Sequence, residues 1–369
     1  MNQDLIKLKT IFIDKKVADS CQFLDNVILN LQVLKFSNDV IINLVSEYDL
    51  RVENYFKKID EELKKDNKGY IRYLDESIKI FNINTDIAFV INKNIKDMIQ
   101  YSNNILDCLS QMINCALMKS YNSKDKVDFG YITKILKNSK YNNLVNIKQI
   151  FNQINNDDEF KFLRKSNNRI KHIKDISTQI GFKLLNGESI TNLDQFTKNN
   201  ITFKKTNIKL KCNEIIKYIE SVIDQVIEAT KKDMVTIKHQ YRYNLLKVWG
   251  QASNSELKFE DYDFFINYIE IKEKDISKIP KQIELIFAKV GKDNDIQIVN
   301  AKPNLILLDV NEKFIGHAIA QEENKDYIEY RKYDVCFDNK EKFNEIINNR
   351  EKMNYYPYFS DGKIVFIGK

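Results

Sequence analysis

The segment "INKNIKDMIQYSNNILDCLSQMINCA" (residues 91–116) carries the clearest helical pattern in the chain. Apolar side chains recur in it at three- and four-residue steps, as they do on the buried face of an α-helix. They are Ile91, Ile95, Met98, Ile105, Leu109, Met112 and Ala116, and only Ser102 interrupts them. The spacing predicts one long core helix around which the neighbouring segments pack.

The rest of the first 279 residues also favours helices, because this part contains no proline and proline interrupts helices. A second long apolar series predicts a helix over 209–236; its members are Ile208, Ile215, Ile219, Val222, Val226 and Met234. Shorter helical patterns cover residues 17–34, 38–66, 70–82, 130–138 and 143–153. We therefore expect a mainly α fold here.

The last ninety residues follow a different pattern. All three prolines, Pro280, Pro303 and Pro357, lie there, and short β-branched runs such as "QIELIFAKV" (282–290) alternate with turn-like segments. We expect strands, with one helix near 338–350. The predicted domains are an N-terminal helical extension (1–82), a helical domain (83–240), a helical and aromatic connector (241–279) and a small strand-rich α+β domain (280–369).

Composition limits the class of protein. The 369 residues are 43% hydrophobic, which is enough for a sizeable core, and the net charge of +6 permits contact with a polyanion without requiring it. Five scattered cysteines contain no C-x-x-C pair, so we expect neither a disulfide framework nor a zinc site, and no cofactor. No run approaches ~18 consecutive apolar residues. We expect a reduced, cytoplasmic protein without a membrane span.

The segment "FLRKSNNRIKHI" (162–173) concentrates the unusual chemistry. It holds one of only three histidines, and residues 164–174 contain five cations and no acid. Asp157 or Asp158 is a suitable N-cap for a helix over about 157–176. Its buried stripe is expected to consist of Phe160, Leu163, Ile170 and Ile173. Asn167 falls on that stripe, where a buried amide needs hydrogen-bond partners.

Arg164, Asn168 and His172 are spaced i, i+4, i+8, so they rise along one side of this helix. A histidine there can take the proton from a ribose 2′-hydroxyl, and a nearby cation can stabilise charge on the phosphate. The row therefore suits RNA cleavage without a metal. The alternative is a solvated basic face in a lysine-rich protein.

The hexapeptide "NNRIKH" (167–172) resembles the R-N-x-x-K-H signature of HEPN domains, a superfamily of helical bundles. In those domains a long helix precedes a variable segment, a shorter motif helix and a last long helix. The long helix with residues 101–121, the motif helix at 157–176 and the helix at 209–236 follow that order. The resemblance covers roughly residues 80–240 and implies a HEPN-like helical bundle.

Many HEPN proteins are metal-independent endoribonucleases of toxin or phage-defence systems, and they typically dimerise across a shared cleft. The resemblance implies a catalytic role for His172 and Asn168, with Lys171 as the basic residue before the histidine. From the basic character of the segment we also expect Lys165, Lys171 and Lys174 to contact RNA. Asn167 occupies the position of the family's arginine, so Arg164 or Arg169 would have to replace it. The implied partners are RNA, a second copy of the chain and an antitoxin or defence protein. The competing hypothesis is a catalytically degenerate scaffold that recognises a partner.

Two other histidines are weaker candidates. His239 lies in "IKHQYRYNLLKVWG" (237–250), where aromatic and basic residues interleave as they do in single-strand RNA sites. Packing at a domain junction explains this segment, including Trp249, more simply. His317 lies in a strand pattern and is interpreted as an ordinary strand residue.

Overall fold

The computed structural model describes isolated positions between residues 5 and 17, residues 19–66, 74–118 and 127–237, and chiefly strands from residue 245 onward. The chain divides into two compact units. One consists of residues 1–24, 112–121 and 234–369, and the other of residues 25–111 and 122–233. The candidate site lies entirely in the second unit, which is mainly helical.

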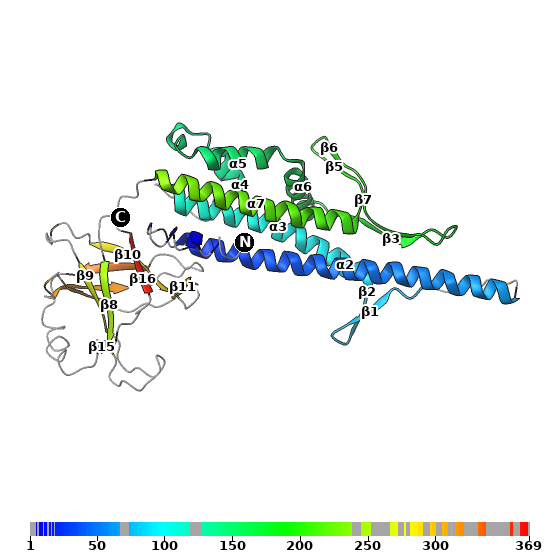
Figure 1. Cartoon of the computed structure of the whole chain (residues 1–369), viewed down its shortest axis with the longest axis horizontal. Coiled ribbons are helices and arrows are strands. Elements are labelled where there is room, and N and C mark those ends of the chain that lie inside the picture. Colours follow the sequence, from blue (N-terminus) through cyan, green and yellow to red (C-terminus); the bar gives the residue numbers. More distant parts are fainter. Residues whose placement is uncertain are drawn as a thin grey trace. The chain divides into compact units, whose positions relative to one another are not determined.

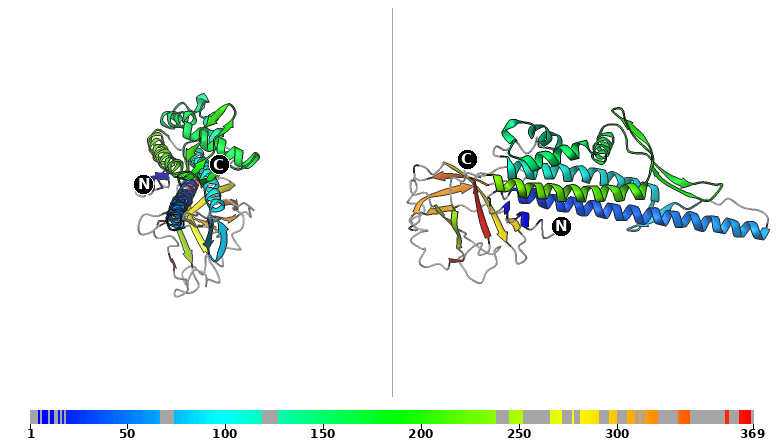
Figure 2. Two further views of the ribbon diagram at one scale, coloured as in Figure 1. Left: turned by 90° about the vertical axis from the view of Figure 1, so that its right-hand side faces the viewer. Right: turned by 45° about the horizontal axis from the view of Figure 1, so that its top comes forward.

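The helices follow the order that the sequence predicts. They are α2 (Asp19–Asp66), α3 (Ile87–Leu117), α4 (Phe129–Ile135), the short 3-10 helix η2 (Ser139–Tyr141), α5 (Val145–Asn156), α6 (Asp158–His172) and α7 (Ile208–Thr236). In the helical unit α3 and α7 run side by side, with α2 on one side of the pair and α4 to α6 on the other (Figures 1 and 2). The predicted helices at 91–116, 130–138, 143–153, 157–176 and 209–236 are confirmed within a few residues at their ends.

The long helix α3 supplies the centre of the core. Every residue of the predicted apolar series is buried on it, from Ile91 to Ala116, and Ser102 is buried as well. The Ser102 hydroxyl donates to the carbonyl of Met98 at 2.7 Å, which satisfies a polar group in the middle of the apolar face. Ile99, Leu106 and Ile113, which lie outside this series, are buried too, so α3 packs against neighbours on more than one side.

Helix α2 is a single helix of 48 residues, although the sequence suggested two helices at 17–34 and 38–66. Its buried residues recur at steps of three or four residues; they are Leu24, Val27, Leu31, Leu34, Ser37, Ile41, Val45, Tyr48 and Val52. Asn30 on α2 contacts Cys108 on α3, and Lys35 pairs with Glu220 on α7. The polar residues at 35–39 do not interrupt the helix because the buried series continues through them.

The predicted helix at 70–82 is wrong. Residues 77–86 form a β-hairpin of β1 (Ser77–Ile80) and β2 (Ile83–Asp86), and Phe81 and Asn82 at its turn have positive φ values of 48° and 65°. A two-residue turn with positive φ at both positions matches the twist of a hairpin. Arg51 of α2 donates to the carbonyl of Ser77 at 2.8 Å, so tertiary contacts hold the strand in place.

A second set of strands, which we did not predict, joins α6 to α7. The strands are β3 (Thr178–Phe182), β4 (Ser189–Leu193), β5 (Phe196–Lys198), β6 (Ile201–Phe203) and β7 (Thr206–Asn207). Strands β3, β4 and β7 form one antiparallel sheet, and β5 and β6 form a separate hairpin. Phe182 packs edge-on against Phe56 of α2, and Ser189 donates to Asp49 at 2.6 Å. These contacts fix the strands on the helical unit.

The other unit contains one nine-stranded sheet. Its strands are β8 (Leu245–Gln251), β9 (Ile266–Ile271), β10 (Gln282–Val290), β11 (Ile296–Val299), β12 (Leu305–Leu308), β13 (Phe314–Ala320), β14 (Arg331–Cys336), β15 (Tyr355–Tyr356) and β16 (Gly362–Ile367). The sheet order is β11-β10-β14-β13-β12-β9-β8-β15, with β16 also pairing with β10. All of these pairings are antiparallel except β9 with β12. The predicted strand-rich character of the C-terminal part is confirmed.

Within the expected helical connector at 241–279, the residues that the structure describes form strands β8 and β9 rather than helices. Trp249 of β8 is paired opposite Tyr268 of β9, and these strands pair with β15 and β12. The expected helix at 338–350 lies outside the described residues, and so does His239. His317 lies in β13 as predicted, opposite Cys336 of β14.

One helix of the described part, residues Ser20–Lys65 of α2, is long and apolar enough to cross a membrane by length and composition. The core helix of a soluble protein and a signal sequence pass the same test, and 28% of the apolar window of α2 is buried. Localisation in the cytoplasm therefore stays a prediction.

Candidate nucleic-acid interface

Helix α6 carries the basic segment, and its two ends complement the helix dipole. Asp157 caps its first turn by accepting from the Glu159 amide at 2.8 Å. Acids occupy that first turn, whereas Arg169, Lys171 and His172 occupy the last turn. Negative charge is stabilising at a helix N-terminus and positive charge at a C-terminus. The sequence therefore fixes where this helix begins and where its cations lie.

The buried face of α6 differs from the predicted stripe. Phe160 and Leu163 are buried as expected, but Ile170 is half-buried and Ile173 is exposed. Phe162 and Ser166 are buried in their place, and Asn167 is buried as expected. The face is rotated because the β5–β6 hairpin covers Phe162, whose ring lies 6.0 Å from that of Phe196 and 5.5 Å from that of Phe203. The helix also ends at His172, which leaves Ile173 outside it.

Two polar contacts lock α6 onto the long helices. The Asn103 side chain of α3 donates to the carbonyl of Leu163 at 3.3 Å. Lys211 of α7 is nearly buried and contacts both carboxylate oxygens of Glu159, at 2.6 and 2.8 Å. The ammonium group also lies 4.5 Å from the centre of the Phe162 ring. The position of the basic segment is thus set from both neighbouring helices.

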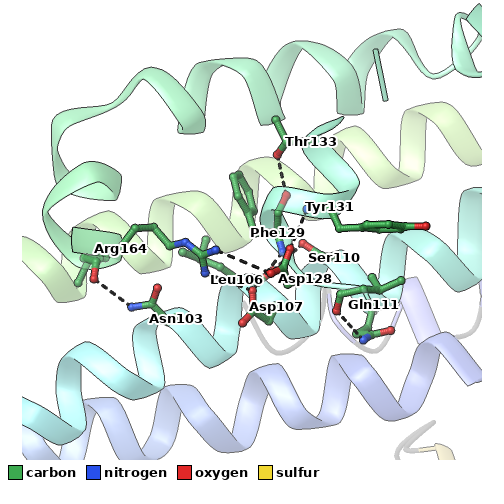
Figure 3. A network of polar contacts seen from close by, with 12 residues as sticks. Asn103, Leu106, Asp107, Ser110, Gln111, Asp128, Phe129, Tyr131, Thr133 and Arg164 are labelled. Carbon is green, nitrogen blue, oxygen red and sulfur yellow. Dashed lines mark hydrogen bonds and ion pairs between the residues drawn. The ribbon is translucent and has the colours of Figure 1, made fainter. Parts of the chain in front are cut away.

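Arg164 does not point freely into solvent. Its Nη1 lies 3.6 Å from Oδ1 of Asp107 on α3, and its Nη2 lies 4.0 Å from Oδ2 of Asp128, the N-cap of α4. Figure 3 shows the guanidinium group directed toward these two carboxylates. The distances are those of ion pairs without tight hydrogen bonds, so the Arg164 donors stay available for a further acceptor.

Asp107 is held by several groups at once. Its carboxylate accepts from the Phe129 amide at 3.1 Å, which ties α4 to α3. Burial raises the pKa of Asp107, while the Phe129 hydrogen bond and the charge of Arg164 oppose that rise. The charge of Lys171 also acts on Asp107. Because Lys171 lies two turns beyond Arg164 on α6, these two cations share one side of the helix.

Arg169 lies on a different side. Its guanidinium carbon is 5.4 Å from the centre of the Phe196 ring of β5. Arg169 follows Arg164 by five residues, which places the two side chains about 140° apart on a helix with ~3.6 residues per turn. The two candidate replacements for the family's arginine are therefore not brought together. Arg164 faces α3 and α4, whereas Arg169 packs on the β5–β6 hairpin.

The remaining predicted residues lie on the open part of α6 and just beyond it. Asn168, Lys171, His172 and Lys174 are exposed, and Lys165 is half-exposed. Within the described part of the chain, neither a hydrogen bond nor an ion pair engages the His172 side chain. Asn167, at the position of the family's arginine, is buried as its place on the apolar stripe predicts. It therefore cannot supply a cation or reach a substrate.

Asp107 and Asp128 are the site residues that sequence reasoning missed. Asp128 precedes "FGYITKI" (129–135), and an aspartate before an apolar series is an N-cap signal; its carboxylate accepts from the Tyr131 amide at 2.7 Å. Asp107 gives no such signal, because nothing in the sequence of α3 distinguishes it from other polar residues on a helix.

The described residues hold no group of three or more His, Cys, Asp or Glu side chains placed to bind a metal ion. Cys21, Cys115 and Cys212 are buried, and Cys108 and Cys336 are half-buried, all as reduced thiols. Burial raises the pKa of Cys108 to about 11, which keeps this thiol protonated.

Comparison with known proteins bears only on the strand-rich part. A family model described as a domain of unknown function, DUF8310, matches residues 243–365. This span begins at β8 and includes every strand through β15, in agreement with β8 and β9 belonging to the sheet. Neither a curated protein nor a solved structure matches the chain.

Proposed function

We propose that this chain acts on RNA through the C-terminal half of α6, as a metal-independent endoribonuclease built on a HEPN-like helical bundle. The observation that carries the proposal is the exposed, unpaired His172 beside Lys171, Asn168 and Lys174 on a helix fixed from both sides. An imidazole that is accessible and free of internal partners can exchange protons with a substrate. Rigid support by the surrounding helices holds such a group in a constant geometry.

The reaction would proceed by internal transfer. His172 accepts the proton of a ribose 2′-hydroxyl while the 2′-oxygen forms a bond to the adjacent phosphorus, and the bond from phosphorus to the 5′-oxygen breaks. The departing 5′-oxygen takes a proton from water. Lys171 and Arg164 lie on the same side of α6, so both can stabilise the phosphate charge. Arg164 would then serve in place of the arginine that Asn167 replaces.

The second candidate function is a catalytically degenerate scaffold that binds a partner, and a specific observation favours it. Asp107 and Asp128 both lie within ion-pair distance of Arg164 and offset its charge. A phosphate would have to compete with these carboxylates. Such a scaffold would keep the helical bundle and the basic surface but would not cleave RNA.

A cleavage assay separates the two functions. Purified full-length protein is incubated with end-labelled RNA in EDTA, beside His172→Ala and the control Lys217→Ala, which removes an exposed cation from α7. We expect cleavage by the wild type and the control and at least ~100-fold slower cleavage by His172→Ala, a typical contribution of a general base. Equal cleavage by all three proteins rejects His172 as the base. Binding of RNA without cleavage supports the scaffold.

A role in a toxin or phage-defence system is part of the same proposal, and it implies that expression slows growth. Induced expression of the wild type should reduce growth and deplete intact cellular RNA, whereas His172→Ala expressed to the same level should not. Normal growth with intact RNA at high wild-type expression counts against a toxin.

A further inference from the structure

Helix α2 has a second apolar series besides the one that it buries. Residues 29, 33, 36, 40, 43, 47 and 50 follow alternating steps of four and three residues. Each lies two positions after a member of the inner series at 27, 31, 34, 38, 41, 45 and 48. Two residues correspond to about 200° around a helix, so the outer series lies on the opposite face.

Five of the seven members of the outer series are apolar, and three of these five are exposed to solvent. Leu29, Phe36 and Leu50 expose 59%, 67% and 56% of their surface, whereas the inner members Val27, Leu34 and Tyr48 expose 1% or less. Val33 and Val40 alternate with the exposed residues of the outer series and are half-buried. Large apolar side chains repeated on one outward face mark an interaction surface.

We infer that this outer face of α2 pairs with the same face of a second copy of the chain. The steps of four and three residues are the heptad spacing of paired helices. Val33 and Val40 then occupy the a positions and Leu29, Phe36 and Leu50 the d positions, and β-branched residues at a with leucine at d favour two-stranded pairs. Asn43 occupies the remaining d position between Phe36 and Leu50 and is the single amide in the series.

The remaining polar member of the series is compatible with pairing. Glu47 falls at an a position, and its carboxylate forms an ion pair with Arg51 one turn later at 2.5 Å. The acid is therefore neutralised within its own helix. Glu47 also lies near one end of the series, which leaves the centre around Phe36 apolar.

The area of this face fits a weak dimer. The span 29–50 is about 33 Å long, which corresponds to roughly 600 Å² per partner and lies near the lower limit of about 1,200 Å² in total for specific interfaces. A lipid surface is a poorer match, because Gln32 and Asp39 flank the apolar series within the same turns. A charged side chain at that depth is costly in a bilayer.

This pairing is separate from the contact that the HEPN resemblance implies. In the helical unit α6 lies on the other side of α3 and α7 from α2 (Figures 1 and 2). Pairing through α2 therefore leaves the open surface of α6 unobstructed. The inference does not depend on RNA cleavage and stands whether or not the proposed function is correct.

Sedimentation equilibrium of the full-length chain from ~1 to ~100 µM tests the pairing, in the range where an interface of this size dissociates. Phe36→Glu places a charge at the centre of the face, and Leu210→Glu, at an α7 residue that is 63% exposed, is the matched control. We expect the wild type and the control to dimerise and Phe36→Glu to weaken the dimer at least ~100-fold, because the charge would be buried. Circular dichroism should show equal helicity for all three proteins.

Two results would overturn the inference. The first is that the wild type remains monomeric throughout the concentration range, and the second is that Phe36→Glu dimerises as strongly as the wild type. Cosedimentation with phosphatidylserine-containing vesicles that Phe36→Glu abolishes would instead assign the face to lipid. The milder Phe36→Ser variant keeps the test valid if Phe36→Glu loses helicity, and it too should weaken the dimer.

Discussion

Arg164 and Asp107 form an ion pair, 3.6 Å between Nη1 and Oδ1, that joins the basic helix α6 to the core helix α3. The pair has two consequences that act in opposite directions. It directs the guanidinium group toward the same side of α6 as Lys171, and it also reduces the positive charge offered to a phosphate. Whether the Asp107 carboxylate positions Arg164 or competes with RNA for it can be measured.

Asp107→Asn keeps the size of the side chain and its ability to accept from the Phe129 amide, but it removes the charge. We expect tighter RNA binding at neutral pH, because Arg164 and Lys171 lose a competing anion. Fluorescence anisotropy with labelled RNA at fixed salt measures this. If Asp107 mainly positions Arg164, affinity falls instead, and Arg164→Ala should then reproduce that loss.

The same carboxyl predicts a pH dependence of stability. Burial raises the pKa of Asp107 above its unfolded value, so the folded state holds this proton more tightly. Protonated Asp107 therefore adds to the free energy of unfolding at a pH below its unfolded pKa, near 3.8. This stabilising contribution is lost as the pH rises through the pKa of Asp107 in the folded protein. Relative to wild type, Asp107→Asn should gain free energy of unfolding as pH rises from acid toward neutrality. Urea titrations at several pH values test this, and a constant difference would contradict it.

Lys171 and Lys174 are exposed beside His172. If they contact phosphates, replacing either by alanine should lower the slope of log affinity against log salt by about 1, since each contact releases roughly one counterion. Lys217→Ala on α7 is the control and should leave the slope unchanged. Equal slopes for all three variants would identify Lys171 and Lys174 as parts of a solvated surface.

Asp233 of α7 caps a helix that lacks a cap of its own. Leu144 at the N-cap of α5 offers no side-chain acceptor, and the buried Asp233 carboxylate accepts from the Ile147 amide at 2.9 Å and from the Asn146 side chain at 2.6 Å. Asp233→Ala should lower the free energy of unfolding by about 1–3 kcal/mol, because buried donors lose their acceptor. Asp224→Ala, at an exposed position of the same helix, should change it by less than ~0.5 kcal/mol. Urea denaturation followed by circular dichroism compares the two variants.

Gly187 at the turn between β3 and β4 has a φ of +65°, and an added Cβ would lie 2.9 Å from Cγ of Phe56. Gly187→Ala should therefore be destabilising by about 1–2 kcal/mol and loosen this hairpin from α2. Gly181→Ala is the matched control, since nothing lies within 4 Å of its added Cβ. Limited proteolysis should cut the 178–193 segment faster in Gly187→Ala than in Gly181→Ala. Thermal melting should give the lower midpoint for Gly187→Ala. Equal behaviour would show that the Phe56 contact contributes little.

The order of the long helices could be predicted because their apolar residues recur at helical steps over many turns. Helix α3 illustrates this, since each predicted core residue from Ile91 to Ala116 is buried. The hairpin at 77–86 could not be predicted, because "SIKIFNINTD" (77–86) is short and its conformation depends on contacts from Tyr48 and Arg51 of a distant helix. Short apolar runs fit a helix or a strand equally well by spacing alone.

The sequence by itself determined that residues 157–172 form a capped helix with cations in its last turn, because capping and helix-dipole effects act between neighbouring residues. It also determined that Asn167 is buried, because the residue lies on the apolar stripe. Only the tertiary structure decided which cation faces which surface. Arg164 meets Asp107 and Asp128, whereas Arg169 packs on Phe196. Those partners come from α3, α4 and β5, and no local pattern in α6 encodes contacts with elements that lie tens of residues away.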